Sequence, residues 1–178
     1  MTTSYKVRVS LYNYFHYKYG LEPSFLFGTN AKGQDISFSY LRDGTFNGCA
    51  GLEKLPDRNP MHIEGAPFVG SGLKVLHFTR VSDFSKGATF AGMPELEAIV
   101  MKSGKVNAET FTNLETEVKI YFYNLTYDEV VKASGNEDWF TNADPKAQFF
   151  FKDTMPEDVQ IPEDTDPYYK SEGGLVVV

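Results

Sequence analysis

The sequence predicts an α/β repeat solenoid in which parallel strands stack one repeat on the next. Four phenylalanines recur along the middle of the chain at intervals of 22, 22 and 21 residues: Phe46, Phe68, Phe90 and Phe111. A short apolar alternation begins five to seven residues after each of them. Self-similarity at a fixed period in this range is typical of stacked repeats. A single repeat cannot bury its apolar face alone, so we expect four anchors and two caps to share one continuous core.

Residues 1–42 are predicted to form a β-rich cap at the N-terminal end of the array. Val7, Val9 and Leu11 alternate with polar residues, and residues 36–40 alternate in the same way, which is the pattern of half-buried strands. Terminal repeats have to cover an apolar end that would otherwise be exposed, and they are therefore usually atypical.

Residues 43–122 are predicted to be the repeat array. In each unit the phenylalanine is expected to be a buried anchor on the turn or short helical side. The apolar alternation after it is expected to be a strand that faces its equivalents in the neighbouring units. Glycines between these segments supply the turns. Strands spaced by one repeat then form a parallel sheet.

The array carries a recurring motif. The run FNGCAGLEKL at residues 46–55 is close to Phe-x-Gly-Cys-x-x-Leu-x-x-Ile, residues 68–76 and 90–99 follow it, and residues 111–114 are a weaker fourth copy. On these residues the chain resembles the leucine-rich repeat family of the bacterial surface-antigen type, which is BspA-like and also called the Treponema pallidum type. The resemblance spans about residues 44–122 and implies a short leucine-rich-repeat array with parallel strands. The family's usual Ile-Pro dipeptide after the strand is absent, and the third and fourth copies lack the cysteine.

Residues 123–152 are predicted to form a C-terminal cap of a helix, a tryptophan and a strand. Thr126 and Glu129 form a capping-box pattern that predicts a short helix ending near Gly135. Trp139 is expected to pack against the array, and the apolar run at residues 147–151 is expected to be a strand. Repeat proteins of this type often close in this way.

Residues 153–178 form an acidic tail. They hold seven acidic residues and one lysine, so they carry −6 of the chain's net charge of −7. Three prolines among the acids favour an extended or disordered segment up to residue 172. The last four residues are strand-prone and suited to extending a sheet edge of this chain or of a partner.

Composition argues against several classes of function. The body of the chain is nearly neutral and lacks the basic stripe that nucleic-acid binding requires. No apolar run approaches the roughly 20 residues of a membrane-spanning helix. The N-terminus shows no secretory pattern, so we expect assembly in a virion or the cytoplasm rather than secretion or display on a cell surface. The single cysteine, Cys49, is expected to be buried and cannot form an intramolecular disulfide.

No arrangement of residues suited to catalysis, cofactor binding or metal binding is found in the sequence. The three histidines have no metal-ligand spacing, and phosphate-loop and nucleophile-elbow motifs are absent. The sequence therefore favours a non-catalytic structural or assembly subunit, such as a component of a virion or another large particle. Its partners would be proteins, either copies of the chain itself or other subunits. The alternative, which the family resemblance implies, is a cell-surface adhesion or ligand-binding module.

Candidate partner-binding residues lie on the repeat face and in the tail. Those on the repeat face are the strand positions expected to be exposed between core positions: Lys54, Lys74, His77, Glu97, Val100, Lys119 and Tyr121. Those in the tail are its strand-prone end: Leu175, Val176, Val177 and Val178.

Overall fold

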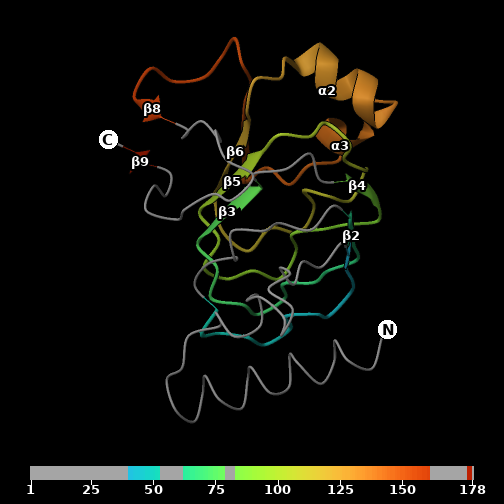
Figure 1. Ribbon diagram of the computed structural model, residues 1–178, viewed down its shortest axis with the longest axis vertical. Helices are drawn as coiled ribbons and strands as arrows, with labels where there is room; N and C mark the ends of the chain where they lie inside the picture. Colours follow the sequence, from blue (N-terminus) through green and yellow to red (C-terminus); the bar gives the residue numbers. More distant parts are fainter. Residues whose placement is uncertain (1–39, 53–61, 79–82, 161–175, 178) are drawn as a thin grey trace, which may run out of the picture.

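Two parallel sheets carry the fold (Figure 1). The computed structural model describes residues 40–52, 62–78, 83–160 and 176–177. The elements in these residues are β1 (Tyr40–Leu41), β2 (His62–Glu64), β3 (Val75–Phe78), β4 (Asp83–Lys86), β5 (Ala98–Met101), β6 (Val118–Phe122), α2 (Tyr127–Ser134), α3 (Asp138–Thr141), β7 (Ala147–Phe150), β8 (Val159–Gln160) and β9 (Val176–Val177). One parallel sheet has the order β1-β2-β4, and the other has the order β3-β5-β6-β7. Parallel strands with few helices make this an α/β-type arrangement.

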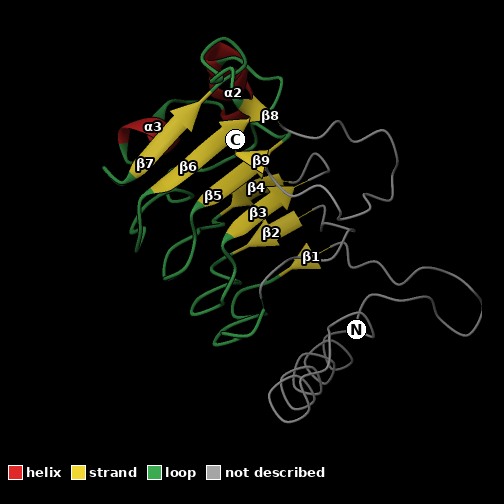
Figure 2. Ribbon diagram, turned by 90° about the vertical axis from the view of Figure 1, so that its left-hand side faces the viewer, coloured by secondary structure: helices red, strands yellow, loops and turns green. Residues whose placement is uncertain are grey.

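Residues that pair within these sheets lie about one predicted repeat apart in the sequence. Tyr40 is opposite His62, 22 residues on, and Ala98 is opposite Lys119, 21 residues on. The chain passes through β2 and then β3, and through β4 and then β5, so consecutive strands belong to different sheets. Figure 2 shows the strands of each sheet lying side by side, with their connecting loops gathered along one side.

Three of the predicted array strands are observed as β3, β5 and β6. The three-stranded sheet, in contrast, was not expected, because the opposite side of each repeat was predicted to be a turn or a short helix. Its strands β2 and β4 are short, and each places one apolar side chain in the core, Ile63 and Phe84. An apolar residue flanked by polar ones over only three positions is too short a pattern to predict a strand on its own.

The four anchor phenylalanines are buried, as predicted. Phe46 stacks on Phe68 with 6.0 Å between ring centroids, and Phe90 stacks on Phe111 at 6.1 Å. Two positions after each anchor the backbone has a positive φ, at Gly48 (70°), Gly70 (68°), Gly92 (70°) and Asn113 (53°). Glycine and, less often, asparagine adopt this left-handed conformation at low energetic cost, which explains the Phe-x-Gly spacing of the motif.

The predicted C-terminal cap is present. Thr126 caps α2 by accepting a hydrogen bond from the Glu129 N–H, and the Glu129 carboxylate accepts one from the Thr126 N–H, while Gly135 ends the helix with φ 91°. Trp139 on α3 is buried, and strand β7 extends the sheet beyond β6. A Cβ atom on Gly104 would lie 2.9 Å from the Cβ of Ala133, so glycine at this position lets the loop pack closely against α2.

Several predictions fall on residues outside the described ranges. The N-terminal cap, apart from β1 and its following turn, is one of them, and Lys54, Leu175 and Val178 are others. The described part of the tail differs from the extended segment that its composition predicts. Residues 152–158 contain turns, and β8 pairs with β9 in an antiparallel two-stranded sheet within the tail itself.

Candidate functional site

The four-stranded sheet has two apolar faces. Its inner face carries the ladder Leu76, Ile99, Ile120 and Phe149, which belongs to or packs against the main core. Side chains alternate between the faces of a strand, so the next ladder lies on the opposite side. That ladder is His77, Val100, Tyr121 and Phe150. We call the side of the sheet that carries it the outer face.

The outer face holds a second hydrophobic cluster, separate from the main core. Its buried members are Ala98, Val100 and Tyr121. Tyr121 stacks on Phe150, with ring centroids 5.0 Å apart and planes inclined by 17°. An apolar row therefore runs across neighbouring strands on the side of the sheet that faces away from the core.

Residues 152–160, here called the cover segment, lie over this row. Met155 and Val159 are half-buried and pack against the cluster of the outer face. The segment follows β7 directly, and Phe151, only 7% exposed, anchors its start in the main core. The Lys152 N–H donates to the Leu125 carbonyl at 2.9 Å, which fixes the point where the cover segment leaves the cap.

The prediction that Val100 and Tyr121 are exposed is wrong. Their exposed fractions are 0% and 1%. Alternation along the strands placed them correctly on the side away from the core. It could not reveal that Met155 and Val159, which come later in the chain, cover them.

The other predicted residues of the repeat face have different environments. Lys74, Glu97 and Lys119 are exposed, and His77 is half-buried. Lys119 lies within β6, and Lys74 and Glu97 immediately precede β3 and β5. In the tail, Val176 and Val177 form β9 and pair with β8. The structure thus brings part of the predicted tail and part of the predicted repeat face into one region through Val159.

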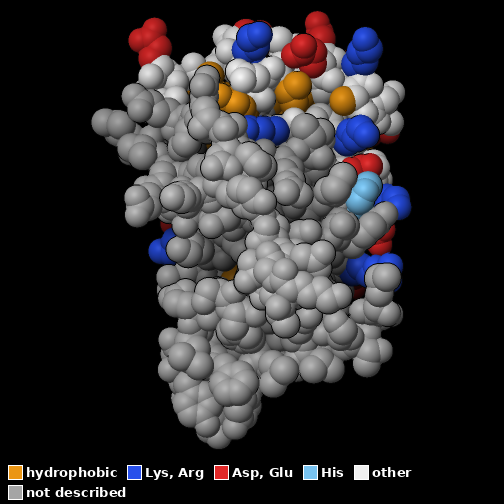
Figure 3. Space-filling model, viewed as in Figure 1, with side chains coloured by type: hydrophobic (Ala, Val, Ile, Leu, Met, Phe, Trp, Pro, Cys, Tyr) orange, Lys and Arg blue, Asp and Glu red, His pale blue; other side chains and the backbone are white. Residues whose placement is uncertain are grey.

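Electrostatics link the cover segment to the outer face. Burial raises the pKa of the Tyr121 phenol, and the negative charge of Asp158 raises it further. Beside the cluster, the Lys102 ammonium lies 5.4 Å from the centre of the Tyr123 ring, within the range of a cation–π interaction. In the view of Figure 3, charged side chains of both signs are spread over the described surface.

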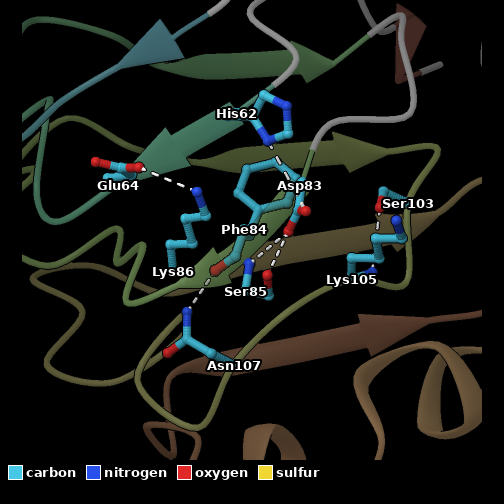
Figure 4. A network of polar contacts seen from close by, with 9 residues as sticks. All are labelled: His62, Glu64, Asp83, Phe84, Ser85, Lys86, Ser103, Lys105 and Asn107. Carbon is cyan, nitrogen blue, oxygen red and sulfur yellow. Dashed lines mark hydrogen bonds and ion pairs between the residues drawn. The ribbon is translucent and has the colours of Figure 1, made fainter.

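A second polar region lies across β2 and β4 (Figure 4). Asp83 accepts hydrogen bonds from the Ser85 N–H at 2.9 Å and from the Ser85 hydroxyl at 2.6 Å. His62 Nδ1 lies 3.8 Å from the other oxygen of Asp83, and Lys86 Nζ lies 3.7 Å from a carboxylate oxygen of Glu64. Because the serine hydroxyl donates to the carboxylate, it does not donate to the imidazole as an activated nucleophile would. These contacts hold β2 and β4 together.

The local turn after β4 is tied to the same region. Asn107 donates hydrogen bonds to the carbonyls of Phe84 at 2.6 Å and Ala88 at 3.0 Å. Burial by itself would raise the pKa of the Asp83 carboxyl, but the hydrogen bonds from Ser85 and the charges of Lys105 and His62 bring it below its ordinary value. The ionised carboxylate is therefore the form that this network stabilises.

An open cleft of about 540 Å³ lies on the loop side of the molecule. Polar side chains from two turns and from the segment after α3 dominate its lining, including Glu109, Asn113, Asn142 and Asp144. It contains none of the residues predicted for partner binding. The outer face is therefore the region where the sequence prediction and the structure meet.

Comparisons with known proteins add no relative. No protein-family model, no curated protein and no solved structure matches the chain significantly. In the part of the chain that the structure describes, no group of three or more histidine, cysteine, aspartate or glutamate residues could hold a metal ion. The helices of that part are also too short or too polar to cross a membrane.

Sequence reasoning missed three residues of the outer face: Phe150, Met155 and Val159. Phe150 was placed in a strand but not assigned to a face, because the run of three phenylalanines at residues 149–151 has no alternation. Met155 and Val159 lie in an acidic, proline-containing stretch whose composition favours disorder. Their spacing of four residues was the one available signal.

Proposed function

We propose that this chain is a non-catalytic protein-interaction subunit that assembles with other proteins through the outer face and the C-terminal tail. A component of a virion or of another large particle would have this role. The observation that carries the proposal is the apolar row of the outer face, which already holds a stretch of polypeptide through Met155 and Val159. A surface that binds one extended segment of chain has the chemistry needed to bind another.

The proposed scaffold for this role is a short leucine-rich-repeat solenoid. Its support is the agreement of three spacings: the anchor phenylalanines, the positive-φ residues two positions after them, and the register of the paired strands. Turns of successive repeats also bond to one another. The Gly48 N–H donates to the Val69 carbonyl at 2.7 Å, and the Gly70 N–H donates to the Gly92 carbonyl at 2.7 Å. Solenoids commonly offer such stacked, extended surfaces to protein partners.

The test is the mass of the full chain in solution, measured by light scattering over a wide range of concentration. We expect an oligomer whose mass falls toward that of the monomer in Lys119→Glu, because Lys119 is exposed on the outer-face side of β6. The matched control is Lys132→Glu, which makes the same charge change at an exposed position on α2, away from the outer face. The control should keep the mass of the wild type.

The opposite result favours the alternative function. A wild-type chain that stays monomeric at every concentration would refute assembly with copies of itself. It would leave the adhesion or ligand-binding module, in which the same face binds a different protein. The match between the Phe-x-Gly motif and the left-handed backbone positions is the observation that favours this alternative, because it supports the resemblance to a surface-antigen family.

A further inference from the structure

We propose that the outer face is a docking surface for an extended acidic segment with two apolar side chains four residues apart, and that the cover segment is its resident occupant. A partner would bind by supplying a segment of the same chemistry while the cover segment lifts away. This inference rests on the proposed function, since it names the kind of partner that the same face accepts. The argument uses three properties of the cover segment: how it is attached, what charge it carries and how its anchors are spaced.

Side chains, rather than the backbone, attach the cover segment to the sheet. Within the described residues, the backbone hydrogen bonds that start in residues 153–160 are local or go to β9. The Thr154 N–H donates to the Phe151 carbonyl at 3.0 Å, the Val159 N–H donates to the Pro156 carbonyl at 3.1 Å, and β8 pairs with β9. Strand β7, in contrast, joins the same sheet through a backbone ladder with β6. The cover segment can therefore leave without breaking a strand ladder.

The charge of the cover segment is opposite to that of the strands beneath it. Asp153, Glu157 and Asp158 are all exposed. Lys119 is the only lysine, arginine, aspartate or glutamate within the four strands of the sheet, and Lys102 follows β5 directly. Complementary charge favours acidic segments over basic ones at such a surface and speeds their encounter with it.

The anchors define the pattern that a partner has to present. Met155 and Val159 both pack on the cluster of Ala98, Val100 and Tyr121. Pro156 lies between them and restricts the backbone of the segment, which lowers the conformational entropy lost on docking. The proposed recognition pattern is thus an apolar residue, three residues that include an acid, and a second apolar residue.

A resident occupant competes with any partner. A segment tethered by a short linker acts at an effective concentration of about 1 mM, so it weakens a partner segment whose own Kd is about 100 µM by about tenfold. Loosening the cover segment should remove this competition. The partner's affinity should then rise although no residue of the outer face has changed.

The experiment uses the full chain and a fluorescein-labelled peptide of residues 152–160, KDTMPEDVQ. The loosened variant is the double substitution Met155→Ser and Val159→Ser, which keeps all the acids. By fluorescence anisotropy we expect the loosened variant to bind the peptide at least about tenfold more tightly than the wild type. A control peptide with serine at both anchor positions should not bind either protein. Adding Lys119→Glu to the loosened variant should weaken its binding of the unmodified peptide.

Two binding results would overturn the proposal. Equal affinity of the wild type and the loosened variant would mean that the cover segment does not compete for the face. Absence of binding to a folded, loosened variant would mean that the face does not accept such a segment. Either result would leave the mass measurement and its Lys119→Glu comparison intact, so a failure here is distinguishable from a failure of the proposed function.

Hydrogen exchange on the wild type provides a second test if the loosened variant does not fold. The proposal requires the amides of residues 155–160 to exchange at least about 100-fold faster than those of β5 and β6, through a local opening of the cover segment. Exchange of the cover segment at the same rate as β6 would show that it opens only when the whole domain unfolds. In that case the cover segment is a fixed part of the core, and the proposal is wrong.

Discussion

Gly72 provides the sharpest test of how closely successive turns stack. Its φ lies outside the left-handed region, so its backbone conformation is open to any residue. A Cβ atom added there would lie 2.0 Å from the carbonyl oxygen of Ala50, one turn earlier in the chain. The same glycine donates its N–H to the Cys49 carbonyl at 3.3 Å. Gly72→Ala therefore leaves the turn conformation unstrained but forces two backbone segments apart.

The size of the effect follows from these contacts. Overpacking by one methyl group costs about 1–3 kcal/mol, and weakening one backbone hydrogen bond adds about 1 kcal/mol. Alanine also restricts the unfolded chain, which offsets about 0.4–1 kcal/mol of that loss. We expect Gly72→Ala to lower the free energy of unfolding by about 2–3 kcal/mol, a large part of the roughly 5–15 kcal/mol typical of a domain.

The matched control is Gly87→Ala. Gly87 has φ +69°, and no atom lies within 4 Å of a Cβ placed there, so alanine meets backbone strain but no clash. Its cost should be about 1 kcal/mol. Urea unfolding, followed by the fluorescence of the single, buried Trp139, measures both variants through the transition midpoint at constant slope. A Gly72→Ala variant no less stable than Gly87→Ala would refute the close approach of the two turns.

Three further predictions concern stability. Ser71 is buried with no hydrogen-bond partner for its hydroxyl, so Ser71→Ala should raise the free energy of unfolding by about 1 kcal/mol, whereas Ser103→Ala should lower it because the Ser103 hydroxyl accepts the Lys105 N–H at 3.1 Å. Thr126→Ala should cost about 1 kcal/mol in urea unfolding through loss of the α2 cap, and Thr126→Ser should restore most of it. The folded-state pKa of Asp83 is lowered, so its stabilising effect is present above its unfolded pKa and is lost as the pH falls below about 4. The wild type should therefore exceed Asp83→Asn in stability at pH 7, with the gap closing at pH 2–3, and a gap independent of pH would contradict this.

The sequence predicted the array and its C-terminal cap because their signals are local. The anchor phenylalanines and the glycines after them recur at a fixed spacing, and each glycine answers a requirement of its own turn. The capping box of α2 lies within four residues and is formed as expected. Strands β3, β5 and β6 were found from alternation alone. In each case the residues that carry the signal also form the contact.

The outer face could not be predicted in the same way, because its burial depends on residues far along the chain. Val100 is covered through Val159, which lies 59 positions later. Alternation reports which side of a strand faces the core, but it does not report what lies over the other side. The strand β4 was missed for a different reason, since a four-residue strand with a single buried side chain, Phe84, leaves almost no pattern.

The failed prediction at Val100 and Tyr121 bears directly on function. Had both side chains been polar, the outer face would have needed no cover, and an acidic tail over it would have had nothing to bind. Their apolar character makes an uncovered outer face costly in water, so the chain gains by covering it with whichever segment fits. A cover held by a backbone ladder would be permanent, as β7 is on β6. A cover held by Met155 and Val159 alone can be replaced by any segment that presents the same two anchors, and this possibility of exchange is what turns a buried row into a binding surface.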